Sequence, residues 1–266
     1  MANAWIVKPL SATVTAVSSS VQAGLPAYLF NDYAGVVLQV ACDAAGNSAG
    51  ITIDLGADTL LDTLLVFGVE LLPIAGTLQL AYATAAQGPF TGAYSNDGSP
   101  AAYAGSAAMT SGKGVSFWAA AAPVTARYLR LTYFGTAAGQ ALRLSRLVIG
   151  RRFQPSRNFS FGAGFGAKDL GSLDFSRRGV LQRTRGAKLR TISLTFASIR
   201  KDEAEASMRP LIEQLGTTEM FALVTDPVVD AQRQNRCSFG PLVGDVALKW
   251  RNAAAWEAGL NQVSIF

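Results

Sequence analysis

The sequence predicts a mainly β protein with two domains, an N-terminal jelly-roll β-sandwich and a C-terminal β-rich domain with one α-helix. Three observations predict this. Short β-rich runs separated by Gly, Pro, Asn and Asp fill residues 11–150. The 266-residue chain is 50% hydrophobic, enough to bury one or two cores of ordinary size. Near Gly150 an alanine-rich, nearly neutral composition changes to a basic stretch dotted with phenylalanine, which indicates a domain boundary.

The first domain, residues 1–150, is expected to contain eight strands, which is the number in a jelly roll. In residues 127–134, Leu129 and Leu131 recur with the period of two that is typical of a strand with one buried face. Residues 88–114 are mostly Gly, Ala, Ser, Tyr and Asn, so they are expected to form a long loop with at most one irregular strand. The expected strands are Thr13–Val21, Val36–Ala41, Ile51–Leu55, Asp62–Leu71, Thr77–Thr84, Val115–Ala119, Arg127–Phe134 and Ala141–Ile149.

The second part is expected to begin with a basic Gly/Phe-rich arm or extended loop, residues 151–188, and to continue as a β-rich domain over 189–266. Ile192, Leu194 and Phe196 alternate with polar residues and predict a strand. Residues 200–215 combine apolar positions at helical spacing with an acidic start and a glycine at 216, which predicts a helix that Pro210 kinks or restarts. Further strands are expected at 219–224, Cys237–Val243, Val246–Trp250 and Leu260–Phe266.

Positive charge is concentrated in one segment of the chain. Residues 151–190 hold ten Lys or Arg and two Asp or Glu. Clustered arginines can neutralise the phosphates of a nucleic acid or the charges of another polyanion. They can also contact carboxylates of a neighbouring protomer, for which the planar guanidinium is well suited. The second interpretation is preferred, and nucleic acid is not expected as a partner.

The composition argues against most catalytic and cofactor chemistry. The chain has no histidine, so the commonest general base and the Ser/His and Cys/His nucleophile arrangements are missing. Two cysteines without histidine do not make the usual zinc site, and Gly162–Gly166 lacks the spacing of a phosphate-binding loop. No catalytic residue, metal or cofactor is therefore assigned. No apolar stretch reaches the length of a membrane-spanning helix, and no secretory signal is expected at the N-terminus.

Aromatic residues in and beside the 88–114 loop are candidates for carbohydrate binding. An aromatic ring can cover the apolar face of a sugar while a neighbouring amide bonds its hydroxyls. The candidate residues are Tyr94, Asn96 and Trp118. Burial in a core is the alternative role for such aromatic side chains.

Two stretches of the first domain resemble the galactose-binding-like, discoidin-type β-sandwich. In the first, a strand ending in Asp54-Leu55-Gly56 precedes a hydrophobic strand, and in the second, Arg127-Tyr128-Leu129-Arg130-Leu131 comes shortly before a closing strand ending at Gly150. The order of elements that follows, from the basic segment through the acidic-start helix to EMFALVTDP, resembles minor tail or baseplate proteins of tailed bacteriophages, distal tail proteins in particular. That family places its ring domain first and any sugar-binding-like domain last, which is the reverse of the order here.

The resemblance implies a non-enzymatic virion protein at the tail tip, assembled in the host cytoplasm, which forms or decorates a ring of identical copies. By family analogy the ring is a hexamer, and other tail and baseplate proteins are the expected partners. A host-glycan-binding module is the alternative. The residues expected to join protomers are phenylalanine anchors with arginines between them: Arg151, Arg152, Phe153, Phe159, Phe161, Phe165, Phe175, Arg177, Arg178, Arg183 and Arg185.

Overall fold

The chain forms two compact units. The computed structural model describes residues 2–44, 46–109, 111–135, 137–244 and 247–266. Unit 1 is formed by Met1–Gln154 and Ala222–Cys237, and unit 2 by Pro155–Phe221 and Ser238–Phe266. Antiparallel strands dominate both units, which confirms the mainly β fold class. The sequence-based division at residue 150 places residues 222–237 in the second domain, whereas the structure places them in unit 1.

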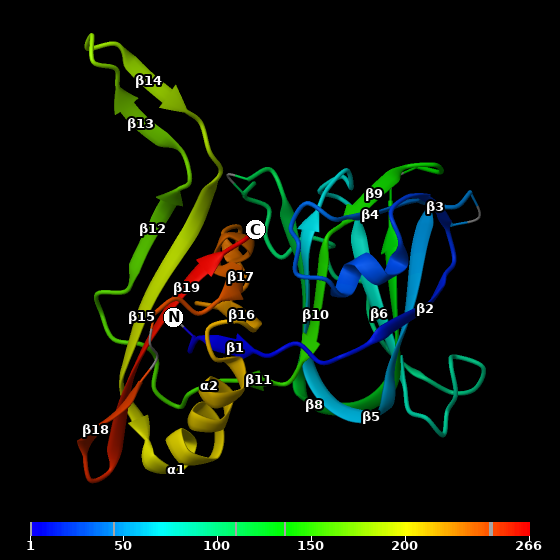
Figure 1. Ribbon diagram of the computed structural model, residues 1–266. Helices are drawn as coiled ribbons and strands as arrows, with labels where there is room; N and C mark the ends of the chain where they lie inside the picture. The colour runs from blue at the N-terminus through cyan, green and yellow to red at the C-terminus, as the bar shows by residue number, and fades with distance from the viewer. Residues whose placement is uncertain (1, 45, 110, 136, 245–246) are drawn as a thin grey trace. The chain divides into compact units, whose positions relative to one another are not determined.

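Unit 1 is built from two main sheets that share one core (Figure 1). The larger sheet has the order β10-β5-β8-β6-β7, with β2 paired to β5, and the smaller has the order β3-β4-β9. Alternate side chains of both sheets are buried, among them Leu129 and Leu131 of β8, as the sequence predicted. The strands are β2 (Thr13–Val17), β3 (Ser20–Ala23), β4 (Leu38–Ala41), β5 (Ser48–Val69), β6 (Thr77–Ala83), β7 (Ser95–Asp97), β8 (Gly114–Phe134), β9 (Ala141–Leu144) and β10 (Arg146–Gly150), with a 3-10 turn at Pro26–Phe30.

The two longest strands differ from the expectation. The sequence predicts four strands, Ile51–Leu55, Asp62–Leu71, Val115–Ala119 and Arg127–Phe134, where the structure has the two bent strands β5 and β8. These strands pair along most of their length and curve together at the bottom of Figure 1, with register shifts in the bend. Most residues of the bend are exposed or half-buried, so the hydrophobic pattern is interrupted there although both strands continue.

A third, small sheet joins distant parts of the chain within unit 1. Strand β1 (Trp5–Val7) pairs with β11 (Arg152–Phe153) on one side and with residues 222–224 of β16 (Met220–Val224) on the other. All three residues of β1 are buried. The segment 222–237, which includes a 3-10 turn at Arg233–Arg236, is thereby part of unit 1.

Unit 2 contains a sheet with the order β12-β15-β19-β18 and a separate hairpin of β13 and β14. Ile192, Leu194 and Phe196 of β15 are buried, which confirms the predicted alternation. The strands are β12 (Gly164–Asp169), β13 (Ser172–Phe175), β14 (Leu181–Thr184), β15 (Lys188–Arg200), β17 (Cys237–Pro241), β18 (Leu248–Asn252) and β19 (Ala255–Ser264). The first residues of the expected Val246–Trp250 strand include Val246, which lies outside the described residues.

The predicted helix is present and contains an irregular middle turn. It consists of α1 (Lys201–Glu203), a π-helical turn (Ala204–Met208) and α2 (Arg209–Leu215). Pro210 stands in the first turn of α2, where its missing N–H is tolerated because the preceding turn is already widened. Gly216 ends the helix at φ 50°, and its N–H bonds the carbonyl oxygen of Ile212, as a C-terminal glycine is expected to do.

Candidate functional site

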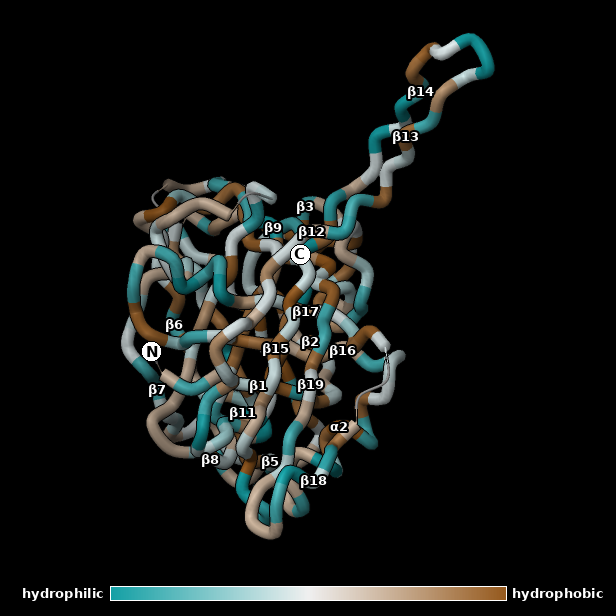
Figure 2. Tube along the Cα trace, turned by 90° about the vertical axis from the view of Figure 1, so that its left-hand side faces the viewer, coloured by the Kyte–Doolittle hydropathy of each residue, from teal (hydrophilic) through white to brown (hydrophobic). Residues whose placement is uncertain are grey.

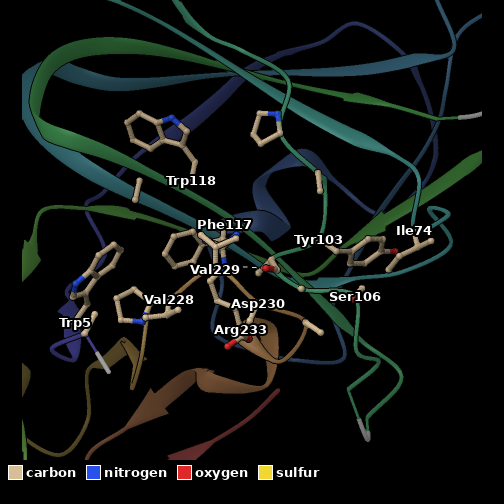
Figure 3. Close-up of a pocket in the computed structure, with 18 residues that line it drawn as sticks. Trp5, Ile74, Tyr103, Ser106, Phe117, Trp118, Val228, Val229, Asp230 and Arg233 are labelled. Carbon is tan, nitrogen blue, oxygen red and sulfur yellow. Dashed lines mark hydrogen bonds between the residues drawn. The ribbon is translucent and has the colours of Figure 1, made fainter.

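A groove of about 730 Å³ opens on unit 1 (Figure 3). In the view of Figure 3, Phe117 and Val229 lie between Trp5 on one side and Tyr103 and Ile74 on the other. Its lining comes from five parts of unit 1: the N-terminal segment with β1, the loop between β5 and β6, the loop before β8, the first part of β8, and residues 222–237, which we call the returning segment. The lining residues are Ala2, Trp5, Ile74, Pro100, Ala101, Tyr103, Ala104, Gly105, Ser106, Phe117, Trp118, Ala119, Pro227, Val228, Val229, Asp230, Ala231 and Arg233.

Four stacked planar side chains fix one wall of this groove. Phe117 stacks on Trp5 with ring centroids 5.5 Å apart. The guanidinium of Arg233 lies 4.5 Å from the Phe117 ring, and that of Arg152 lies 4.3 Å from the Trp5 ring. Each cation over a ring face contributes on the order of 1 kcal/mol. Because Arg233 belongs to the returning segment and Phe117 to β8, the stack fastens that segment to the sandwich.

The charged groups of the groove have fixed partners. Arg233 donates its Nε–H to the carbonyl oxygen of Ala104 at 2.8 Å, and burial lowers the pKa of Arg233. Asp230 accepts hydrogen bonds from Arg236, which lower the pKa of Asp230. The Asp230 side chain remains 45% exposed. The groove is therefore apolar in its walls and carries an ionised carboxylate at an accessible position.

Of the three predicted sugar-binding residues, Trp118 is buried and the other two are exposed. Trp118 is 5% exposed and donates its Nε1–H to Asp97 at 2.8 Å, so its ring is part of the core. Tyr94, directly before β7, and Asn96, within it, are exposed and are not part of the groove lining. Trp118 bonds Asp97 of β7 and also lines the groove, so this side chain supports the structure of both.

Tyr94 forms an aromatic platform with Phe90 and Arg130. The Phe90 ring meets the Tyr94 ring edge to face, with centroids 5.4 Å apart, and the guanidinium of Arg130 lies 4.2 Å from the Phe90 ring. Phe90 adopts φ 63°, a left-handed conformation that is rare for a bulky residue. The platform thus offers an exposed tyrosine ring whose partner Phe90 carries a cation, and Asn96 follows Tyr94 two residues along the chain.

In unit 2 the basic arm is a β-ribbon (Figures 1 and 2). We call residues 164–188 the ribbon; it comprises β12, β13 and β14. Strand β12 pairs with β15, and beyond it the β13–β14 hairpin continues with every strand residue exposed. Apolar and polar residues alternate along the hairpin in Figure 2. The turn at its tip holds Arg177 and Arg178.

The register of the hairpin sorts its side chains by polarity. Phe175 pairs with Leu181 and Leu173 with Arg183, so these four side chains share one face. The opposite face holds two polar pairs, Asp174 with Gln182 and Ser172 with Thr184. The ribbon therefore has one apolar face with an arginine and one wholly polar face.

The predicted interface residues fall into two groups. Phe161, Phe165 and Phe175 are 63–107% exposed, and Arg151, Arg177, Arg178, Arg183 and Arg185 are exposed as well. The other three make contacts within their own unit. Arg152 donates to the carbonyl oxygen of Ala120 and stacks on Trp5, Phe153 pairs with Ile6, and Phe159 packs edge to face on Phe196.

Several exposed apolar residues were not predicted to be exposed from the sequence. Leu170, Leu173, Val180 and Leu181 add to the apolar surface of the ribbon. The signal was present, because Leu173 and Phe175 alternate with polar residues before the Arg177-Arg178-Gly179 turn. Val228 and Val229 carried no such signal, since a short apolar pair in a loop is indistinguishable from a buried one.

A search of the residues that the structure describes finds no group of three or more His, Cys, Asp or Glu side chains placed to hold a metal ion. Within the same residues no helix is long and apolar enough to cross a membrane.

Comparison with known proteins gives structural matches only. No family model matches the chain, and no curated protein matches it. A family 32 carbohydrate-binding module of C. perfringens NanJ in complex with galactose matches at 9% identity and a TM-score of 0.41, over 55% of this chain and 98% of that one. A lectin domain of lectinolysin complexed with Lewis B antigen matches at 12% identity and a TM-score of 0.37, over 54% of this chain and 94% of that one.

A Ruminococcus gnavus GH29 fucosidase in complex with fucose matches at 17% identity and a TM-score of 0.39, over 53% of this chain, which spans a quarter of the fucosidase. At such identities and TM-scores these matches transfer no function to this chain. Nothing in the comparisons supports the phage-tail assignment, which stays a prediction.

Proposed function

We propose that the chain is a non-enzymatic structural protein whose copies assemble through the ribbon of unit 2. The supporting observation is the exposed apolar surface of the ribbon and of the segment that leads into it. Seven large apolar side chains there are 52–107% exposed: Phe161, Phe165, Leu170, Leu173, Phe175, Val180 and Leu181. A two-stranded hairpin is marginally stable alone in water, so covering its apolar face on a partner would stabilise it.

The exposed area is of the size that an interface needs. Three phenylalanines at 63–107% exposure present on the order of 450 Å² of apolar surface. A standard interface buries about 800 Å² on each partner. The phenylalanines supply more than half of that area, and the leucines and valine of the ribbon add to it.

The resemblance to bacteriophage tail proteins suggests where such an assembly would be found. It places the assembly at the tip of a bacteriophage tail, as a ring of identical copies, hexameric by family analogy, in contact with other tail proteins. This setting rests on the order of elements in the sequence, whereas the assembly itself rests on the ribbon.

Sedimentation velocity of the full chain tests the assembly. The variant Phe175→Ser/Leu181→Ser alters one cross-strand pair on the apolar face, and Asp174→Ser/Gln182→Ser alters the adjacent pair on the polar face. We expect the first variant to be monomeric at concentrations at which the wild type and the second variant are oligomeric. A wild-type chain that stays monomeric at high concentration rejects the proposal.

A second candidate function, glycan binding by unit 1, is favoured by the platform of Tyr94, Phe90 and Arg130. The Tyr94 side chain is 44% exposed, and its ring is held in place by the edge-to-face contact with Phe90. An exposed aromatic ring can stack on the apolar face of a sugar, and the polar side chain of Asn96, two residues along the chain, has the chemistry to bond sugar hydroxyls.

Glycan-array screening followed by calorimetry tests this candidate. Tyr94→Ala removes the exposed ring, and Tyr33→Ala removes another exposed tyrosine of unit 1, 73% exposed, as the matched control. We expect Tyr94→Ala to abolish any binding that the wild type shows and Tyr33→Ala to retain it. Binding that is unchanged by Tyr94→Ala excludes the platform.

A further inference from the structure

We propose that the groove of unit 1 receives the ribbon of a second copy, so that copies join head to tail. This inference rests on the proposed assembly through the ribbon and adds the surface that accepts it. The segment that enters the groove is the apolar face of the ribbon, with Leu173, Phe175 and Leu181.

The groove has the surface that this face needs. Its walls are apolar and aromatic, with Phe117, Trp118 and Pro100 among them. Its rim adds Ile74, Val228 and Val229, which are 59%, 43% and 78% exposed. Apolar side chains gathered at the mouth of an apolar depression mark a contact surface, because each is covered only when something enters. A depression of about 730 Å³ has room for several side chains.

The distribution of charge favours the groove, and not a second ribbon, as the surface that the ribbon contacts. The ribbon holds six basic and two acidic residues, so two ribbons in contact would bring like charges together. The lining of the groove holds one cation, Arg233, and one carboxylate, Asp230, which is paired with Arg236 and 45% exposed. The lining charges therefore balance, and they do not repel Arg183 on the apolar face of the ribbon or Arg177 and Arg178 at its tip.

The ribbon and the groove are different surfaces, which determines how the copies can be arranged. Each copy carries one ribbon and one groove, so a ribbon-to-groove contact is heterologous. Such a contact leaves a free ribbon at one end and a free groove at the other, and it continues until a ring closes or a filament grows. A self-complementary contact would stop at a dimer.

Mixing two interface variants of the full chain tests the inference. The ribbon variant is Phe175→Ser/Leu181→Ser, and the groove variant is Ile74→Asp/Val229→Asp, at rim positions exposed enough to tolerate the change. Val21→Asp, an exposed apolar position of unit 1 outside the groove lining, is the control. Circular dichroism confirms that each variant is folded before sedimentation.

We expect each variant alone to be monomeric and an equimolar mixture to form heterodimers and nothing larger, because the mixture retains one intact ribbon and one intact groove. The Val21→Asp control should assemble like the wild type. A groove variant that still assembles, or a mixture that stays monomeric, overturns the groove as acceptor. A ribbon variant that still assembles overturns the proposed function itself, so the two failures are distinguishable.

Cross-linking provides a second measurement that does not depend on disruptive substitutions. Both native cysteines, Cys42 and Cys237, are buried and should not react with a bismaleimide under native conditions. Chains with Phe175→Cys mixed with chains with Val229→Cys should give a covalent heterodimer, whereas Phe175→Cys mixed with Val21→Cys should not. Equal cross-linking of both mixtures would overturn the inference.

Discussion

Trp118 shows how one side chain changes role between sequence and structure. Its burial and its bond to Asp97 make it an internal support of β7. Trp118→Phe removes a hydrogen bond to a carboxylate, so we expect the free energy of unfolding to fall by about 2 kcal/mol in urea denaturation. Trp250→Phe, at a 53% exposed position of unit 2, should change it by less than about 0.5 kcal/mol. Equal effects would show that the bond to Asp97 contributes nothing.

Asp54 and Arg127, two residues of the galactose-binding-like resemblance, meet in the structure. Arg127 donates Nε–H and Nη2–H to the two oxygens of Asp54 at 2.9 and 3.0 Å. The Asp54 carboxylate also accepts the N–H of Gly56 at 2.7 Å, where the chain turns at φ 82°. These bonds, led by the one from Arg127, lower the pKa of Asp54 below its ordinary value. The sequence shows both residues but does not predict their contact, because 73 positions separate them.

The lowered pKa of Asp54 gives the stability a pH dependence of known sign. The bonds stabilise the ionised form, so their contribution is fully present above the unfolded pKa of about 3.9 and is lost as the pH falls through the lower folded value. Asp54→Asn should therefore have a lower urea midpoint than the wild type at pH 7, and the difference should shrink below about pH 4. The same difference at pH 3 and pH 7 would contradict this account.

At the scale of elements, the sequence predicts strands and helices that depend on neighbouring residues, but not strands that depend on pairing with a distant segment. The alternation at Leu129 and Leu131 and the helix before Gly216 depend on neighbours in the chain, and both are present. Strand β7 depends on pairing with β6, and the hairpin of β13 and β14 stands outside any core. Strand β7 therefore leaves no hydrophobic period in the sequence, whereas the alternation at Leu173 and Phe175 does not reveal that the hairpin lies outside a core.

The end of the helix carries a prediction of its own. Gly216 adopts φ 50° and ψ −142°, a conformation that only glycine adopts readily, with open space around its Cα. Gly216→Ala should lower the free energy of unfolding by about 1–3 kcal/mol through backbone strain alone. Gly259→Ala, in β19 with equally open space and no positive φ, should change it by less than about 0.5 kcal/mol in the same urea titration. Similar losses in both variants would contradict a conformational cause.

At the scale of the whole molecule, the chain enters unit 1 twice. It leaves at Gln154, returns at Ala222 and leaves again at Cys237. The returning segment supplies Arg233 of the stack and, with it, six of the residues that line the groove. No sequence signal marks this return, because its strand and turn look like those of either unit. A fragment cut at the predicted boundary of residue 150 would lack the segment, so binding by unit 1 must be measured on the whole chain.

Trypsin distinguishes a free ribbon from an assembled one. Arg177 and Arg178 stand in the exposed turn that closes the hairpin, where a protease can bind an extended chain without unfolding a core. In dilute monomer we expect the first cut after these residues, identified by mass spectrometry. Above the assembly concentration the ribbon is covered by the next copy, and cleavage there should slow at least tenfold.

The Phe175→Ser/Leu181→Ser variant keeps the same turn but loses the apolar pair, so it should be cut rapidly at both concentrations. This control separates protection by a partner from simple dilution of the protease by more substrate. Wild-type particles that are verified as assembled and yet are cut at the tip as fast as monomer would show that the ribbon stays in solvent, and that some other surface holds the copies together.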